Sequence, residues 1–168
     1  MSRQPPVDPV PHLAAVAKAA AEGDGPPAVF TALDGALAAT LGHKLFTALL
    51  FHAATGESER FYTNQPRAYP IGGRKPLNPT FWAKLVIEGR RPYLGRTAAD
   101  IKAVFFDHAL IDSLGCRSVI NLPVVEAGKI LGTLNILHEE RWYDEADFML
   151  GAVFAALAVP AFQRLLAR

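Results

Sequence analysis

The chain has 168 residues and a mass of 18.1 kDa, which is enough for one domain of ordinary size. Hydrophobic residues make up 51% of it and charged residues 20%, so it can bury a core, and general disorder is excluded. A net charge of +1 argues against a dedicated nucleic-acid-binding protein, because such proteins carry a basic excess. The single cysteine excludes an intramolecular disulfide framework.

Signals for secretion or for a membrane span are missing from the sequence. The first residues contain no apolar core after a charged start. The longest apolar run, 148–162, is shorter than the roughly 18–20 residues that a span needs, and it contains Pro160. We interpret this run as a buried or oligomer-forming helix. We therefore expect a bacterial-type cytoplasmic protein with no membrane partner and no nucleic-acid partner.

Hydrophobic periodicity and turn residues predict an alternation of helices and strands. A polar, proline-rich arm over 1–9 comes first, and we assign 1–27 to an N-terminal arm with a short helix and 28–168 to the main domain. In chain order we expect helices over 11–22 and 28–41, strands over 44–54 and 60–64, a loop over 65–77, a helix over 78–88, a short strand over 91–94, a helix over 97–114, strands over 117–125 and 129–138, and a last helix from 144.

Capping residues support three of these helix starts. Asn78 with Pro79 offers an N-cap and a proline at the first helical position. Thr97 followed three residues later by Asp100 resembles a capping box. Asp144 is the expected cap of the last helix.

The turn of the 117–138 hairpin fixes its register, and the register decides which side chains share a face. We take 126–128 as a three-residue loop with a left-handed glycine, which places Val125 opposite Lys129. The alternative is a two-residue turn that pairs Val125 with Ile130 and puts one asparagine on each face.

The three-residue loop gives one wholly apolar face and one mixed face. The apolar face is expected to pack on helices. The mixed face gathers Asn121, Thr133 and Asn135, three polar groups that need side-chain, water or ligand partners. Asn121 and Asn135 can orient a ligand, or they can bond backbone or ordered water in a structural role.

At this hairpin the chain resembles a GAF domain, a small-molecule-sensing relative of PAS domains. The matching stretch reads CRSVINLPVVEAGKILGTLNILHEERWYDEADF, and the order of elements matches from about residue 28 onward. The features that carry the resemblance are Ser118, Pro123, Gly128, Gly132, the Leu134–Asn135 pair, Asp144 and Asp147.

The resemblance implies an α+β fold with a central antiparallel sheet of five to six strands. Terminal helices would cover one face, and a ligand-type pocket would lie on the other face under the segment 65–115. Members of the family often dimerise through the terminal helices, so a homodimer is expected. They bind cyclic nucleotides, tetrapyrroles, amino acids and other metabolites, or no known ligand.

Two chemically defined branches of the family are disfavoured by particular residues. Tetrapyrrole-binding members often attach the chromophore through a cysteine followed by histidine, whereas Cys116 is followed by Arg117. Free methionine sulfoxide reductases use several cysteines, and the resemblance puts Asp112 at their catalytic cysteine and Val119 at an acidic ligand-binding position. Only Asn135 stays polar, at an aspartate position.

Aromatic, polar and charged residues around the expected pocket complete the candidate site. The candidate ligand-binding residues are Tyr62, Trp82, Phe105, His108, Ser118, Asn121, Thr133 and Asn135. Most of the aromatic residues, and His108 on an apolar helical stripe, can instead be core residues, and Cys116 is read as a small buried one. Residues 64–96 hold seven Lys or Arg and one Glu, which indicates either a solvated patch or a preference for an anionic ligand.

Catalytic and metal-binding patterns do not stand out in the sequence. We therefore expect no cofactor, and a small-molecule-binding domain in signal transduction that acts through a dimer or a partner protein. The alternative is an interaction or dimerisation module with a vestigial pocket. A small enzyme is the third and least favoured reading.

Overall fold

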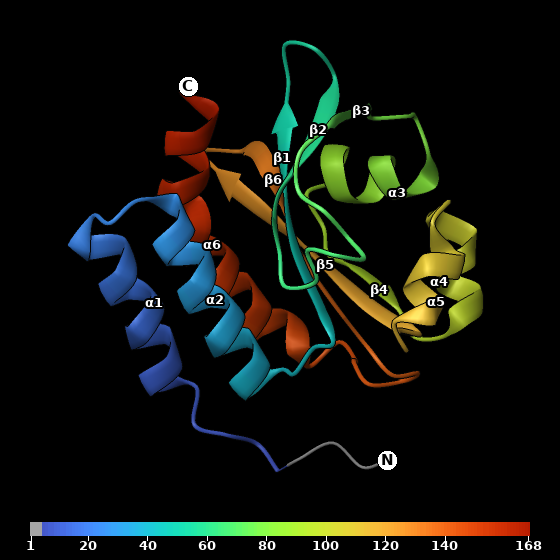
Figure 1. The fold of residues 1–168 in the computed structure, drawn as a ribbon, viewed down its shortest axis with the longest axis horizontal. Helices are drawn as coiled ribbons and strands as arrows, with labels where there is room; N and C mark the ends of the chain where they lie inside the picture. The colour runs from blue at the N-terminus through green and yellow to red at the C-terminus, as the bar shows by residue number, and fades with distance from the viewer. Residues whose placement is uncertain (1–4) are drawn as a thin grey trace.

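An antiparallel sheet of six strands forms the middle layer of the chain (Figure 1). The structure, a computed structural model, describes residues 5–168. Across the sheet the order is β3-β2-β1-β6-β5-β4, which confirms the predicted α+β class and strand number. The strands are β1 (Leu45–His52), β2 (Glu57–Thr63), β3 (Arg74–Pro76), β4 (Tyr93–Gly95), β5 (Ser118–Glu126) and β6 (Lys129–His138).

Three long helices cover one face of the sheet, as the family resemblance implied. They are α1 (Val10–Glu22), α2 (Pro26–Thr40) and α6 (Asp147–Leu166). Of the predicted arm, residues 1–4 lie outside the described residues, and 5–9 have no regular secondary structure. Helix α1 packs on α2 and α6, and its Val16 is fully buried.

Short helical pieces cover the opposite face. They are α3 (Phe81–Ala83), the π-helical turn η1 (Lys84–Glu88), α4 (Ala98–Val104) and α5 (His108–Ser113). The helix predicted from Asn78 begins two residues late, because Thr80 is extended and its hydroxyl accepts the Ala83 N–H at 3.2 Å. The capping box of Thr97 and Asp100 is confirmed.

Two local features of this covering segment differ from the prediction. The single helix expected over 97–114 is broken at 105–107, where Phe105 is extended (φ −108°, ψ 123°). Strand β3 lies inside the predicted loop over 65–77. It was missed because three exposed residues, arginine, lysine and proline, carry no hydrophobic alternation.

The even-numbered residues of the central hairpin pack on the helical layer. Ile120, Leu122 and Leu134 are buried in the same core as Phe154 and Phe162 of α6. Helix α6 has the length and composition of a membrane span, but this packing gives its apolar surface a place in the core of the fold. The reading of 148–162 as a buried helix is thereby supported.

The hairpin register differs from the favoured prediction, although the faces do not. The turn has two residues, Ala127 and Gly128, both at positive φ, and Val125 pairs with Ile130, as the alternative proposed. A bulge at Leu131 then adds one residue to β6. The turn is one residue shorter than predicted and the bulge adds one residue to β6. The side chains beyond the bulge therefore point to the predicted faces, and the polar ones still share one face.

Asn121 consequently pairs with Asn135, whereas the predicted three-residue loop would have placed Thr133 opposite it. Thr133 pairs with Pro123 on β5 and with Leu49 on β1. The mixed face lies away from the helical layer and beneath the short helices of the covering segment (Figure 1).

A second bulge changes the facing of side chains on β2. Ala48 pairs with Tyr62, but the next residue, Leu49, pairs with Arg60, which leaves Phe61 as the extra residue. Tyr62 and Phe61 therefore both pack toward the helical layer. Arg60 turns to the opposite face of the sheet.

Candidate functional site

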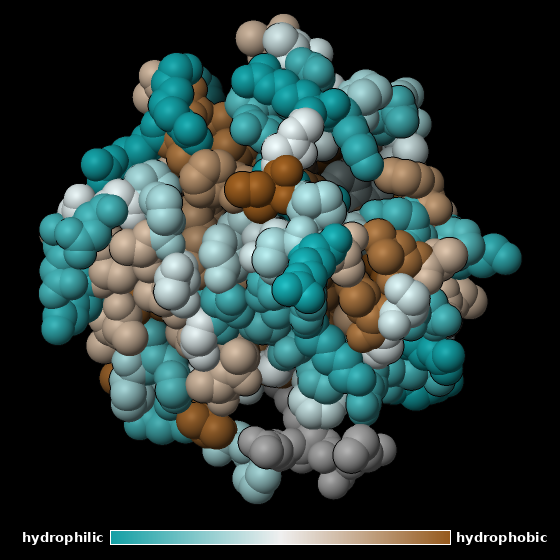
Figure 2. All heavy atoms as spheres, viewed as in Figure 1, coloured by the Kyte–Doolittle hydropathy of each residue, from teal (hydrophilic) through white to brown (hydrophobic). Residues whose placement is uncertain are grey.

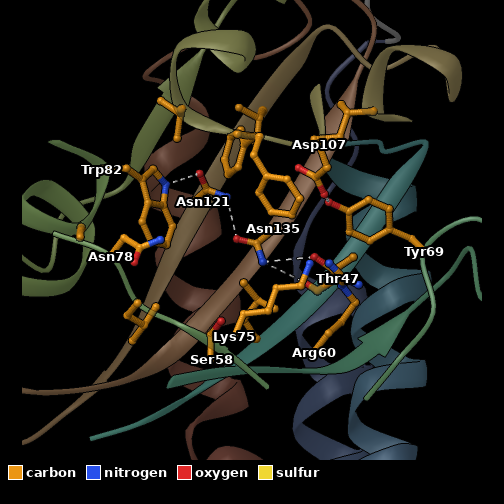
Figure 3. A pocket seen from close by; sticks show the side chains of 18 of the residues that line it. Thr47, Ser58, Arg60, Tyr69, Lys75, Asn78, Trp82, Asp107, Asn121 and Asn135 are labelled. Carbon is orange, nitrogen blue, oxygen red and sulfur yellow. Dashed lines mark hydrogen bonds between the residues drawn. The ribbon is translucent and has the colours of Figure 1, made fainter. Parts of the chain in front are cut away.

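A cavity of about 360 Å³ lies between the sheet and the covering segment 65–115 (Figure 3). Its volume is at the lower end of the range of roughly 300–1,000 Å³ that is typical of small-molecule sites. Odd-numbered residues of β1, β5 and β6 form its floor, which follows from the alternation of side chains along strands. The apolar residues of the floor are Leu45, Leu49, Phe51, Val119 and Leu137.

A directed chain of hydrogen bonds crosses this floor. Trp82 donates its indole N–H to the Asn121 carbonyl oxygen at 2.9 Å. The Asn121 amide donates to Asn135 at 2.7 Å, and the Asn135 amide donates to the Thr47 hydroxyl at 3.2 Å. Figure 3 shows these contacts as a continuous line from β5 across β6 to β1. The chain ties a helical residue of the cover to three strands of the sheet.

The two asparagines bond mainly to other side chains, rather than to backbone or ordered water as their structural alternative proposed, and they also line the cavity. Asn121 is 2% exposed and Asn135 5% exposed, so unpaired amides would be costly there. Asn121 accepts from Trp82 and donates to Asn135. Asn135 in turn donates to the hydroxyl and the carbonyl of Thr47. The orientation of both amides is therefore fixed before any ligand enters.

The opposite end of the cavity is cationic. The guanidinium carbon of Arg60 lies 3.9 Å from the centre of the Tyr69 ring, and Nη1 donates to the Pro70 carbonyl at 2.9 Å. Among residues 5–168, the buried Nε of Arg60 has no acceptor. Lys75 lies at the rim, with Nζ 4.6 Å from the centre of the Phe106 ring.

One carboxylate accompanies these cations. Tyr69 donates its hydroxyl to Asp107, which lies in the break between α4 and α5. Burial raises the pKa of Asp107, although its own backbone N–H and the nearby Arg60 act in the opposite direction. Burial also lowers the pKa of Arg60, with Asp107 opposing the shift. The charged groups that line the cavity are therefore two cations, Arg60 and Lys75, and one acid, Asp107.

The structure brings four of the predicted site residues together. Trp82, Phe105, Asn121 and Asn135 all line the cavity. Trp82 packs edge-on against Phe105, with the ring centres 6.4 Å apart. The other four predicted residues, Tyr62, His108, Ser118 and Thr133, do not line it.

Tyr62 lies on the helical side of the sheet because of the bulge at Phe61. Its hydroxyl donates to Asp34 of α2 at 2.6 Å, and His43 Nε2 lies 3.0 Å from the other carboxylate oxygen. Burial tends to raise the pKa of Asp34, but the hydrogen bonds from His43 and Tyr62 outweigh it, so this pKa is lowered. Tyr62 is thus a structural residue of the helical layer.

Ser118 and Thr133 are buried in the sheet, one paired and one not. The Ser118 hydroxyl donates to the Glu139 carbonyl at 2.6 Å, beyond the end of β6. Thr133 is on the polar face but fully buried, and its hydroxyl has no hydrogen-bond partner in the described part of the chain. Neither hydroxyl faces the cavity.

His108 lies outside the main cavity because the helix break at 105–107 redirects the chain. It lines a separate hollow with Lys102, Asp112 and Cys116. Burial raises the pKa of Cys116 to about 11, so its thiol is protonated at neutral pH. Within the described range, 5–168, no cluster of three His, Cys, Asp or Glu residues could hold a metal ion.

Three residues of the cationic end were missed by the sequence analysis. Arg60 was passed over in favour of Tyr62, because simple alternation puts both on one face. Tyr69 and Asp107 lie in segments whose local conformation the pattern does not reveal, a loop and a helix break. The excess of basic residues over 64–96 was visible, but of those residues only Lys75 lines the cavity.

Comparison with known proteins supports the fold. No protein-family model and no curated protein matches the sequence. Among solved structures, the GAF domain of a phosphoenolpyruvate-protein phosphotransferase from Coxiella burnetii superposes with a TM-score of 0.76 at 16% identity, covering 95% of each chain. The GAF domain of the Acinetobacter phosphoenolpyruvate-protein phosphotransferase gives 0.74 at 11% identity, covering 94% of each.

A third similar structure holds a ligand. The phycocyanobilin-bound GAF domain of a cyanobacterial phytochrome superposes with a TM-score of 0.72 at 16% identity, covering 96% of this chain and 98% of that one. Identities this low show the fold alone. The chain therefore has the fold of a GAF domain over about 95% of its length.

Proposed function

We propose that the chain is a small-molecule-binding sensory or regulatory module, whose cavity takes an anionic ligand. The observation that carries this proposal is Arg60, a half-buried cation that lines one end of a preformed cavity and forms no ion pair among residues 5–168. A partly desolvated cation without a counter-charge in contact is unfavourable, and an anionic ligand would supply that counter-charge. Lys75 at the rim adds a second positive charge.

The proposed contacts at the other end are Trp82, Phe105, Asn121 and Asn135. Trp82 and Phe105 offer aromatic surface, and the asparagines hold Trp82 in place through the hydrogen-bond chain. Cys116 does not line this cavity, which favours a ligand held without a covalent bond to the protein. The phycocyanobilin-bound GAF domain of a cyanobacterial phytochrome provides the precedent for a ligand in this fold.

The proposed output is a change in a homodimer or in a partner protein. Met149 is 82% exposed and Val153 42% exposed on α6, so this terminal helix presents apolar side chains outward. The same observation supports the alternative of an interaction module with a vestigial pocket. Sedimentation equilibrium of wild type and Met149→Glu tests self-association through α6. Loss of self-association in the variant supports this surface, and a wild-type monomer at high concentration contradicts it.

A thermal-shift screen with a matched pair of variants tests the binding proposal. The panel contains small carboxylates, phosphate esters and cyclic nucleotides. Arg60→Gln removes a cation that lines the cavity, whereas Arg67→Gln removes an exposed cation of the basic segment 64–96 that does not line it. A ligand at 100 times its Kd stabilises by about 2.7 kcal/mol, so Tm would rise by several degrees.

The expected result is a saturable rise in wild type and Arg67→Gln that is lost in Arg60→Gln. No rise for any anion, in protein whose denatured mass spectrum shows no carried-over small molecule, would contradict the proposal.

A further inference from the structure

The N–H groups of Arg60 that have no acceptor decide where the anionic group of a ligand can bind. A guanidinium carries five N–H groups in one plane. The Arg60 guanidinium makes one hydrogen bond within residues 5–168, from Nη1 to the Pro70 carbonyl. Because the Tyr69 ring covers one face of the guanidinium, new partners must approach in the plane. Nε has no surface open to the cavity, so the Nη2 donors are the ones that an oxygen of an anionic group can meet in that plane.

Asp107 limits the charge that this end can accept. Its carboxyl group accepts from Tyr69, the residue on which Arg60 stacks, and it interacts electrostatically with the guanidinium without forming an ion pair among residues 5–168. The lining charges of Arg60, Lys75 and Asp107 leave a single net positive charge. A ligand with one negative charge matches this balance, whereas a dianion would meet repulsion from Asp107.

The other end of the cavity has little polar capacity left. Trp82 already donates its indole N–H to Asn121, and Asn121 and Asn135 are bonded to each other. What remains is an aromatic corner, in which Trp82 lies edge-on to Phe51 and to Phe105, with ring centres 6.4 Å apart in each pair. Figure 3 shows Trp82 and Arg60 at opposite ends of the cavity. An apolar group gains most from contact with such surface.

We infer that the ligand is an amphipathic monocarboxylate, with its carboxylate on Nη2 of Arg60 and its apolar body in the corner formed by Trp82, Phe51 and Phe105. This inference rests on the proposed function, since it names the ligand class of the same cavity. The negative charge of Asp107 favours a singly charged carboxylate over a doubly charged phosphate monoester.

The two tryptophans of the chain provide matched reporters for a test by NMR. The Trp82 indole N–H lies in the cavity, whereas the Trp142 indole N–H donates to the Leu41 carbonyl on the helical side. The probes are phenylacetate, phenylacetamide and phenyl phosphate, which share an aromatic body and differ in the charge of the head group. Each is titrated into wild type, Arg60→Gln and Arg67→Gln while both indole resonances are followed.

We expect phenylacetate to shift the Trp82 resonance saturably, at least tenfold more tightly than phenylacetamide and phenyl phosphate, without moving Trp142. Arg60→Gln should remove that preference, and Arg67→Gln should keep it. Equal binding of the acid and the amide, or tighter binding of the phosphate, would overturn the inference and leave ligand binding in the cavity standing. No shift of Trp82 with any probe would count against both the inference and the proposed function.

Discussion

Arg60 and Tyr62 lie two residues apart on β2 but face opposite sides of the sheet, because the bulge at Phe61 inserts an extra residue between them. Arg60 thereby enters the cavity, and Tyr62 reaches Asp34 in the helical layer. Without the bulge, period-two alternation would put both side chains on one face. A single inserted position therefore supplies the cation on which the proposed function depends.

Replacing Thr133 by valine tests whether its buried hydroxyl has a hydrogen-bond partner. Its hydroxyl is fully buried without a partner, so Thr133→Val should leave the free energy of unfolding unchanged or raise it by up to about 1 kcal/mol. Thr47→Val is the matched control. It removes the acceptor hydroxyl of Asn135 and should cost about 1–2 kcal/mol. Urea denaturation of both variants gives the comparison, and a loss above 1 kcal/mol in Thr133→Val would show that its hydroxyl has a partner.

Tyr62→Phe should destabilise the fold in a pH-dependent way. The hydroxyl bonds the Asp34 carboxylate, and a bond to a charged group is worth about 1.5–3 kcal/mol. Because the folded pKa of Asp34 is lowered, this stability is fully present above its ordinary value of 3.8 and is lost as pH falls through the lowered pKa. Unfolding free energies of wild type and Tyr62→Phe should therefore differ at pH 7 and converge in strong acid. A difference that stays constant down to pH 2 would contradict the role of the ionised carboxylate.

The turn between β5 and β6 contains a strained residue. Ala127 has φ 49° and precedes Gly128 with φ 76°, a pair of values that asparagine followed by glycine adopts most readily. Ala127→Asn should raise the free energy of unfolding by roughly 0.5–1 kcal/mol, and Ala127→Val should lower it, since a β-branched residue is disfavoured at positive φ. Thermal unfolding of the two variants checks the order. Equal stabilities would argue against the two-residue turn.

The Cys116 thiol should react slowly with alkylating reagents in the folded protein. Burial raises its pKa to about 11 and the residue is 1% exposed, so little accessible thiolate is present at neutral pH. Labelling by iodoacetamide at pH 7.5, followed by mass spectrometry, should be at least a hundredfold slower than in 8 M urea. Similar rates in the two conditions would show that the segment around Cys116 opens readily.

The strand hairpin shows what the sequence could predict and why. Alternation alone separated Ile120 and Leu122 from Asn121 and Asn135, and the structure keeps these two faces apart. The assumed turn was one residue too long, and the bulge at Leu131 compensated for it. The prediction of which side chains share a face is therefore confirmed, whereas the predicted pairs of residues across the two strands are wrong.

The cationic end of the cavity depends on features that leave no clear pattern. The bulge at Phe61 reverses the facing of Arg60, and the extended Phe105 breaks a helix that periodicity predicts to be continuous. Asp107 reaches Tyr69 only because of that break. Sequence periodicity describes only which side chains share a face in an unbroken strand or helix, so neither interruption is visible in it. On the face that Figure 2 shows, the most hydrophobic residues lie in small separate groups.

The most direct test of ligand binding at Arg60 is the pair of indole N–H resonances, recorded with a pooled set of small monocarboxylates in wild type and in Arg60→Gln. Binding in the cavity predicts that the Trp82 resonance moves in wild type, that it stays in place in Arg60→Gln, and that the Trp142 resonance is unchanged in both. A Trp82 resonance that stays in place in wild type, or that moves equally in both proteins, would contradict a ligand site built around Arg60.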